Sequence, residues 1–268
     1  QDAFGVLVFV AILVSLFRRF VLKVKRLEVD SKGKLDAAAI LSLIIMVVVT
    51  MFGQNITNFA IHGFVFTENE YRPITKALAG LFYNSSDIGC ATCWYEVFWW
   101  GHILIIFSFM NFLPYSKHFH VITSIPNVYF GKVGERKLAL SKLNLEEETD
   151  IFGVADVDQF HWKHLLDGFS CTECGRCMAN CPANGTGKSL SPRKIIEDIR
   201  HRTEEKAPLL INKVENEEIL GKTLVHNYIK DEELWACTTC GACVQECPVM
   251  IEHVDAIVDM RRNLVLSE

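Results

Sequence analysis

The sequence CTECGRCMANCP at residues 171–182 recurs as CTTCGACVQECP at residues 237–248. Both runs have the spacing C-x2-C-x2-C-x3-C-P, so the chain carries an internal repeat offset by 66 residues. Two such runs are typical of a pair of [4Fe–4S] clusters, because three thiolates on one tight loop reach three iron corners of a cubane. The fourth cysteine, which we expect at the start of the following helix, points away from that loop and toward the other cluster.

The crossed arrangement predicts two sets of ligands, since each fourth cysteine serves the other cluster. They are Cys171, Cys174, Cys177 and Cys247 for the first cluster and Cys237, Cys240, Cys243 and Cys181 for the second. A zinc site is the alternative, but four-cysteine zinc sites usually consist of two separated C-x2-C pairs. A secreted disulfide scaffold is excluded because the chain is too long, too apolar and too clustered in its cysteines.

The stretch between the two cysteine runs is predicted to be helical. Ser191 and Pro192 form an N-cap followed by proline at the first helical position, and Ile195, Ile196 and Ile199 continue as an apolar stripe. The cysteine-rich half is therefore expected to be an α-helical module with its clusters in loops.

The first half of the chain is membrane-like. Half of the 268 residues are hydrophobic and the mean hydropathy is +0.20, and three apolar runs predict membrane helices at about 3–22, 35–61 and 94–114. Three buried helices of a soluble protein are the alternative, which so few charges in these runs disfavour. The net charge of −5 gives no electrostatic reason to expect a nucleic-acid partner.

Basic residues predict the orientation of these helices. The segment between the first two runs holds Arg18, Arg19, Lys23, Lys25, Arg26, Lys32 and Lys34, whereas the segment between the second and third holds only Arg72 and Lys76. By the positive-inside rule, the first segment and everything after Leu113 lie in the cytoplasm, and the loop 64–93 faces outward. The chain begins with Gln1, which leads us to expect a fragment or a processed product.

Histidines in the membrane part are candidate haem ligands, because an ionisable residue inside a membrane segment is a functional candidate. His102 and His120 are 18 residues apart, so on one continuous helix they would share a face about 27 Å apart, a spacing that suits two b-type haems. His62 could face His102 as the second ligand. Alternatively, the partners lie on another helix, or His102 makes a buried hydrogen bond and His120 is an interfacial loop residue.

Two further features of the membrane half are ambiguous. Cys90 and Cys93 are predicted to lie in the outward loop, as a disulfide or as two packed thiols. Polar residues at the end of the second run suit either a quinone pocket or an ordinary interfacial helix end; they are Gln54, Asn55, Thr57 and Asn58.

The apolar part resembles the gamma subunit of respiratory nitrate reductase and the membrane subunit of heterodisulfide reductase, on His102, His120 and the segment 113–117 (LPYSK). The second half resembles the two-cluster module of heterodisulfide-reductase-type iron–sulfur proteins, on both cysteine runs and the segment 187–193 (GKSLSPR). Members of this group that combine both parts are membrane oxidoreductases. The resemblance implies electron transfer between menaquinone and a cytoplasmic redox partner. That partner would be electron-transfer flavoprotein or a catalytic domain or subunit with CCG motifs.

These observations predict an all-α protein in three parts: a transmembrane domain at 1–122, a cytoplasmic connector at 123–165 and a two-[4Fe–4S] module at 166–268. The expected function is electron transfer between a membrane quinone or b-type haem and a cytoplasmic redox partner, at a cytoplasmic (inner) membrane. The alternatives are part of a thiol–disulfide reductase of the heterodisulfide type, or a cofactor-free membrane anchor that carries a ferredoxin module.

Overall fold

The computed structural model describes residues 1–24, 27–28, 31–62, 72–82, 88–134, 138–143, 146 and 152–266, and these contain helices and no strand. The predicted all-α class is therefore confirmed. Lys25 and Arg26 of the predicted basic segment lie outside the described residues, as do 63–71 and 83–87 of the predicted outward loop. The chain forms two compact units, Gln1–Ser116 and Lys117–Glu268, which places residues 117–122 with the second unit.

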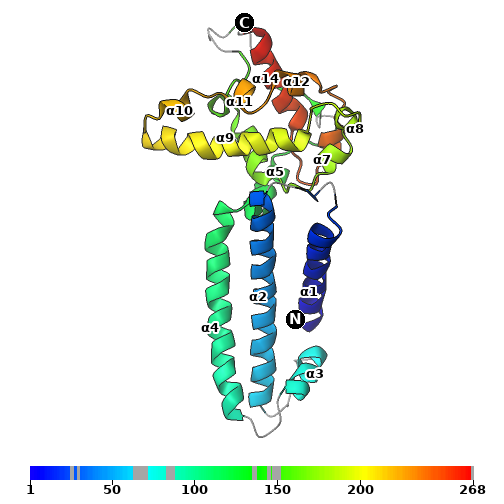
Figure 1. Cartoon of the computed structure of the whole chain (residues 1–268), viewed down its shortest axis with the longest axis vertical. Coiled ribbons are helices and arrows are strands. Elements are labelled where there is room, and N and C mark those ends of the chain that lie inside the picture. Colours follow the sequence, from blue (N-terminus) through cyan, green and yellow to red (C-terminus); the bar gives the residue numbers. More distant parts are fainter. Residues whose placement is uncertain are drawn as a thin grey trace. The chain divides into compact units, whose positions relative to one another are not determined.

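The described residues of the first unit form four α-helices, which Figure 1 labels. They are α1 (Asp2–Leu16, continued by the π-helix η1, Phe17–Val21), α2 (Ser31–Ile61), α3 (Pro73–Phe82) and α4 (Ile88–Phe112, followed by the 3-10 turn η3, Leu113–Tyr115). In the described part of the chain, three segments are long and apolar enough to cross a membrane: Asp2–Val21, Gly33–Ile61 and Gly89–Tyr115. The three predicted membrane helices are thus present, and α4 begins six residues earlier than expected.

Small residues let the membrane helices approach closely. A Cβ on Gly53 of α2 would lie 2.6 Å from the ring of Phe98 on α4, and a Cβ on Gly5 of α1 would lie 2.7 Å from the ring of Phe52 on α2. Apolar side chains on the remaining faces are exposed, among them Phe4 and Leu104. This is the distribution expected of helices that pack through small residues and present apolar side chains to lipid.

The second unit is built from short helices around two longer ones. Its elements are η4 (Lys117–Phe119), α5 (His120–Tyr129), η6 (Val157–Gln159), α6 (Trp162–Ser170), α7 (Arg176–Ala179), α8 (Pro182–Gly185), α9 (Pro192–Asn212), α10 (Glu217–Leu220), α11 (Leu224–Asn227), α12 (Asp231–Trp235), α13 (Ala242–Gln245) and α14 (His253–Leu266). The two long helices are α9 and α14 (Figure 1).

The hydrophobic core of the second unit lies between α9 and its neighbours. The predicted stripe of Ile195, Ile196 and Ile199 is fully buried there, together with Ile257 of α14. The predicted start of α9 is also confirmed, because the Ser191 hydroxyl accepts a hydrogen bond from the Lys194 backbone N–H and Pro192 is the first helical residue. The two cysteine runs are attached to this core.

Asp156 is held in a buried ion pair that should be essential for the stability of the second unit. Its carboxylate accepts hydrogen bonds from Arg202 at 3.0 and 2.7 Å and from Lys206 at 2.8 Å. The Arg202 side chain is fully buried, so the change Asp156→Asn leaves an uncompensated charge and should cost about 3–5 kcal/mol. We expect the melting temperature, followed by circular dichroism, to fall by on the order of 10 °C.

The matched control is Asp158→Asn, because Asp158 also pairs with Lys206 (2.6 Å) but its side chain is 44% exposed. This change should lower the free energy of unfolding by less than about 1 kcal/mol.

Burial alone would raise the pKa of Asp156, but the hydrogen bonds from Arg202 and Lys206 outweigh it and hold the pKa below its usual range. The stabilisation is therefore present above the unfolded pKa of about 3.9 and is lost as the pH falls through the folded pKa. Equal melting temperatures for the two variants would contradict this role of the pair.

Candidate metal centres

The two cysteine runs adopt the same backbone conformation, 66 residues apart. Gly175 and Gly241 have φ values of +70° and +74° and begin the short helices α7 and α13. Glu173 and Thr239, two residues before these glycines, also have positive φ, at +50° and +54°. Glycine adopts this left-handed conformation readily, whereas Glu173 and Thr239 are residue types that do not signal it, so their positive φ could not be predicted from the sequence.

Backbone N–H groups point at two of the cysteine sulfurs. The Thr239 N–H donates to Cys237 Sγ at 3.4 Å, and the Ile251 N–H donates to Cys247 Sγ, also at 3.4 Å. Donors of this kind stabilise a thiolate, which is the form that binds iron. The loops therefore offer sulfur atoms already surrounded by the polar groups that a cluster needs.

Four of the predicted ligands line one small cavity. Cys171, Cys174 and Cys177 come from the first run and Cys247 from the second, and Pro248 and Ile251 complete part of the wall. Burial, together with the neighbouring Cys247 and Cys174, raises the pKa of Cys177 to about 12. The fold thus brings the last cysteine of the second run to the first three cysteines of the first run.

The other four cysteines form a second group. Burial raises the pKa of Cys237, and Cys181 and Cys240 lie near enough to raise it further. Burial likewise raises the pKa of Cys243 to about 12, with contributions from Cys237, Cys177 and Cys181. Because the pKa of Cys243 is raised by cysteines of both groups, the two groups lie next to each other.

The raised pKa values have a chemical consequence for metal binding. A thiol with a pKa of about 12 is protonated at neutral pH, so iron must displace a proton from Cys177 and Cys243. Positive charge assists at the first group, where Arg176 and Arg193 line the cavity and Arg193 lowers the pKa of Cys177. The donor set of four sulfurs around one cavity fits an iron–sulfur cluster.

The fourth cysteines differ in one respect from the expectation that each opens a helix. Cys181 does so, as the N-cap of α8 with Pro182 at the first helical position. Cys247 instead precedes a turn at Pro248 and Val249, and the next helix, α14, begins only at His253. The prediction was wrong for Cys247, because proline after a cysteine is as compatible with a turn as with a first helical position.

Gly241 should be intolerant of any side chain. Its φ of +74° costs an L-residue about 1–2 kcal/mol, and an added Cβ would lie 2.5 Å from the Leu138 side chain. We therefore expect Gly241→Ala to lower iron content per chain and to speed cluster loss in air several-fold. Gly185→Ala is the control, because Gly185 ends α8 with ordinary φ and open space around it; equal cluster lifetimes in both variants would refute the argument.

His102 lies on α4 and contacts α2. Its Nδ1 is 2.9 Å from the Thr50 hydroxyl, and that hydroxyl donates to the backbone carbonyl of Met46 at 2.7 Å. The Thr50 oxygen is therefore left to accept from His102 Nδ1–H, which makes Nε2 the ring nitrogen available to a metal. Sequence reasoning found His102 but missed Thr50.

Two expectations about the haem histidines were wrong. His62 lies 12 residues beyond Thr50 on α2, roughly 18 Å along the helix, so it does not face His102. His102 and His120 do not share one helix, because α4 ends at Phe112 and extended backbone at Ser116 precedes α5. Pro114 accounts for this break, since it cannot continue the hydrogen bonding of the helix.

His120 nevertheless has the same hydrogen-bonding pattern as His102. Its Nδ1 lies 2.9 Å from the Lys117 carbonyl, to which only Nδ1–H can donate, so Nε2 is again available. His62 Nδ1 lies 2.8 Å from the Asn58 carbonyl at the exposed end of α2. Within the first unit, His62 and His102 are therefore not brought together as a ligand pair.

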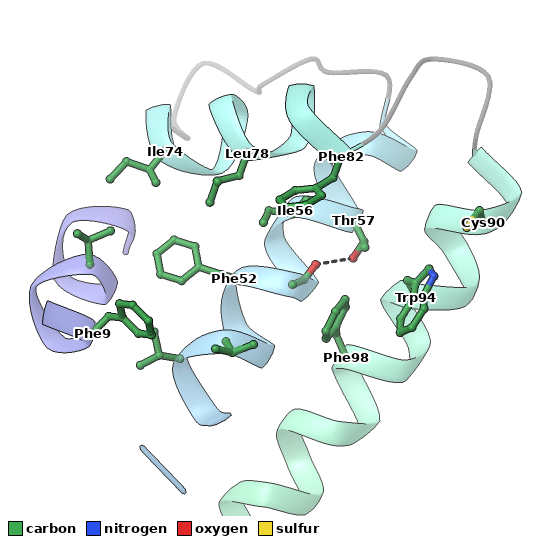
Figure 2. Close-up of a pocket in the computed structure, with 14 residues that line it drawn as sticks. Phe9, Phe52, Ile56, Thr57, Ile74, Leu78, Phe82, Cys90, Trp94 and Phe98 are labelled. Carbon is green, nitrogen blue, oxygen red and sulfur yellow. Dashed lines mark hydrogen bonds between the residues drawn. The ribbon is translucent and has the colours of Figure 1, made fainter. Parts of the chain in front are cut away.

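A cavity of about 670 Å³ lies among α1, α2, α3 and α4 of the first unit (Figure 2). Its wall is almost entirely apolar and includes Phe9, Phe52, Ile56, Leu78, Trp94 and Phe98. Of the four polar residues suggested for a quinone pocket, only Thr57 lines it, and the Thr57 hydroxyl donates to the Gly53 carbonyl at 2.8 Å. Gln54, Asn55 and Asn58 do not line this cavity.

Cys90 and Cys93 are free thiols in the first turns of α4 rather than residues of a loop. Cys90 also lines the apolar cavity (Figure 2). The disulfide interpretation is therefore wrong.

Comparison with known proteins agrees with this description. Residues 170–251 match the family model of the 4Fe-4S dicluster domain, so the chain is a helical iron–sulfur protein with membrane-spanning segments. It resembles membrane-bound iron–sulfur oxidoreductases of the heterodisulfide-reductase type. No solved structure matches the chain.

Three relatives illustrate the resemblance. The "Probable iron-sulfur-binding oxidoreductase FadF" of Bacillus subtilis is 32% identical over 297 residues, covering 100% of this chain and 41% of that protein. The "EtfAB:quinone oxidoreductase" of Syntrophomonas wolfei is 36% identical over 203 residues, covering 69% of this chain and 28% of that protein. The "Probable membrane-anchored ferredoxin" of Chromohalobacter salexigens is 37% identical over 156 residues, or 50% of this chain and 22% of that protein. The chain thus spans less than half the length of these relatives.

Proposed function

We propose that this chain conducts electrons between a quinone in the membrane and a soluble redox partner in the cytoplasm. The observation that carries the proposal is the grouping of eight cysteines into two adjacent sets, in a chain that also has three helices able to span a membrane. When bound, each [4Fe–4S] cluster takes up and releases one electron. Adjacent sets give such electrons a short path through the second unit.

The proposed ligands of the first cluster are Cys171, Cys174, Cys177 and Cys247, and those of the second are Cys237, Cys240, Cys243 and Cys181. The shared cavity of the first four and the mutual pKa effects of the second four support this crossed assignment. Arg193 supplies positive charge beside the first set. Thr239 and Ile251 direct backbone N–H groups at Cys237 and Cys247.

The cytoplasmic side is the proposed location of the second unit. Arg18 and Arg19 lie at the end of the first membrane segment and Lys23 just after it, whereas only Arg72 and Lys76 are basic between the second and third. A cytoplasmic partner would be electron-transfer flavoprotein, in keeping with the name of the Syntrophomonas relative, or a catalytic protein with CCG motifs, as the resemblance to heterodisulfide reductases implies.

The apolar cavity of the first unit is the proposed site for the isoprenoid chain of menaquinone. Its lining of aromatic and aliphatic side chains suits a hydrocarbon chain, and it offers few groups for a quinone carbonyl, since the Thr57 hydroxyl already donates to Gly53. Ile56→Trp should therefore raise the KM for a long-chain menaquinone several-fold without changing that for a short-chain analogue. Leu104→Trp, on an exposed face of α4, is the control.

A b-type haem at His102 is a second candidate cofactor. The hydrogen bond between Nδ1 and Thr50 favours it, because this bond orients the ring and leaves Nε2 as the ligand atom. The second axial ligand would have to come from a residue other than His62. Reduced α and β bands in the optical spectrum that disappear in His102→Ala would support this candidate, and a broad iron–sulfur absorbance alone would eliminate it.

The proposal is tested with anaerobically purified protein in liposomes. We expect about eight iron and eight acid-labile sulfide per chain, and reoxidation of dithionite-reduced clusters by menaquinone. Stoichiometric zinc without sulfide, or reduced clusters that menaquinone does not reoxidise, would overturn it. The rival thiol–disulfide reductase needs a dithiol outside the eight ligands, so replacing Cys93 with serine would abolish that activity but should leave electron transfer intact, because Cys93 does not line the cavity.

A further inference from the structure

Helix α5 has its polar residues inside and its apolar residues outside. Val121, Ile122, Ile125 and Tyr129 are 55%, 52%, 73% and 81% exposed, whereas Thr123 and Asn127 are buried. At about 100° per residue, the four exposed positions lie within an arc of about 100°, opposite Thr123 and Asn127. This is the reverse of the pattern of a helix that packs on a soluble domain.

Aromatic residues extend the apolar face. Phe130 follows α5 and is 53% exposed, and its ring packs edge-on against Trp162 of α6, which is 50% exposed, with 5.2 Å between centroids. Tyr129 packs against Phe130 in the same way at 4.9 Å. We call the exposed residues Val121, Ile122, Ile125, Tyr129, Phe130 and Trp162 the α5 face.

The inner side of α5 is bonded to segments that hold cysteines of the first set. The Thr123 hydroxyl donates to the Phe169 carbonyl at 2.9 Å, two residues before Cys171. The Asn127 amide donates to the Val249 carbonyl at 2.9 Å, two residues after Cys247. Lys117, just before α5, forms an ion pair with Glu173 at 2.8 Å, within the first cysteine loop. The helix and the first set of cysteines therefore form one rigid piece.

We propose that the α5 face lies in the membrane–water interface and that α5 thereby holds the first set of cysteines next to the bilayer. The cluster order that follows, with the first cluster nearer the membrane and the second nearer the soluble partner, rests on the proposed function. Only four residues separate Tyr115, the end of a membrane-spanning segment, from His120, the first residue of α5. An extended chain of that length reaches at most about 18 Å, so α5 begins close to the bilayer surface.

The chemistry of the α5 face fits an interface. An amphipathic helix buries its apolar side about 5–10 Å into the boundary between headgroups and acyl chains, and tyrosine and tryptophan are enriched at that depth. The described part of the chain leaves this face open. The second set of cysteines differs from the first in its exposure, because it includes Cys240, which is exposed, whereas none of the first set is.

The test uses the full chain with its clusters, in nanodiscs that contain a phospholipid with a photoactivatable diazirine in its acyl chain. After illumination and digestion, mass spectrometry should find label on peptides covering 120–133 at least about 10-fold above that on peptides covering 209–222. The second region is a matched reference, because Leu210, Ile211 and Val214 are 48%, 79% and 50% exposed. Ile125→Glu with Tyr129→Glu should reduce the label on α5 at least 5-fold, whereas Ile211→Glu should not.

Equal labelling of the two regions would overturn the proposal, and so would protein cross-links from the α5 face to a second copy in place of lipid label. Iron content and circular dichroism show whether the charged variants are folded; single replacements Ile125→Gln and Tyr129→Gln provide milder alternatives. Lipid labelling does not require electron transfer, so a failure of quinone reoxidation with intact labelling would reject only the proposed function.

The cluster order has its own readout. A lipid with a chelated Gd³⁺ headgroup should shorten the spin relaxation time of the cluster that remains in Cys240→Ser more than that of the cluster that remains in Cys174→Ser. The opposite order would refute the placement of the first set beside the bilayer.

Discussion

Replacing Cys247 with serine should damage the cluster held by Cys171, Cys174 and Cys177 and spare the cluster of its own sequence neighbours. The reason is geometric: Cys247 lines the cavity of the first set, and Cys181 lies beside the second. Iron should fall from about eight to about four per chain, measured on anaerobic protein. The matched variant Cys181→Ser should cause the same loss from the other cluster.

Double variants identify which cluster each cysteine serves. Cys247→Ser with Cys174→Ser removes two ligands of one cluster and should lose no more iron than either change alone. Cys247→Ser with Cys240→Ser affects both clusters and should retain almost none. This non-additivity reports membership of one site. The converse result, with about four irons retained only in the second pair, would refute the crossed assignment, and Cys90→Ser is the control for replacing a cysteine outside both sets.

The cysteine spacing predicted most of the metal-binding half. The spacing is a short-range property, because eleven consecutive residues largely determine which sulfurs can surround one cluster. The cap at Ser191 and the stripe of Ile195 and Ile196 were likewise local signals, and both were confirmed. What the spacing could not reveal was the left-handed backbone at Glu173 and Thr239, since that conformation is imposed by the loop and not by the residue type.

The histidines of the membrane half show why sequence periodicity fails over longer distances. The 18-residue separation of His102 and His120 is meaningful only on an unbroken helix, and Pro114 lies between them. The partner of His102 turned out to be Thr50, which no composition or spacing rule singles out. Contacts between helices depend on the register at which they pack, here determined by Gly53 against Phe98, and that register is a property of the folded pair.

Helix α5 could not be predicted from the sequence for a related reason. Residues 123–165 were read as a solvated connector because acidic residues at 146–150 dominate its composition. The part that became α5 carries alternating polar and apolar residues whose orientation has meaning only when the inside of the unit is known. Thr123 and Asn127 are buried because cysteine-bearing segments offer carbonyl groups there, at Phe169 and Val249.

Removing the clusters should unfold both cysteine runs and leave the membrane helices intact. Helices α7, α8 and α13 have only four residues each, too few to be stable without tertiary support. We expect that support to come from the metal. Without it, the buried thiols of Cys177 and Cys243 remain protonated, and no shared metal cross-links the two cysteine runs.

Hydrogen exchange followed by mass spectrometry measures this loss directly. After oxidative removal of iron in the presence of a chelator, amides at 171–190 and 236–252 should exchange at least about 100-fold faster, which corresponds to about 2.7 kcal/mol of lost protection. Amides of α2 and α4 should not change, because their hydrogen bonds lie within helices that need no metal. Helix α9 should lose protection only partly, since Ile195, Ile196 and Ile199 keep an apolar core with α14. Unchanged exchange in the cysteine runs would mean that the loops are preformed and that the fold of the second unit does not depend on the clusters.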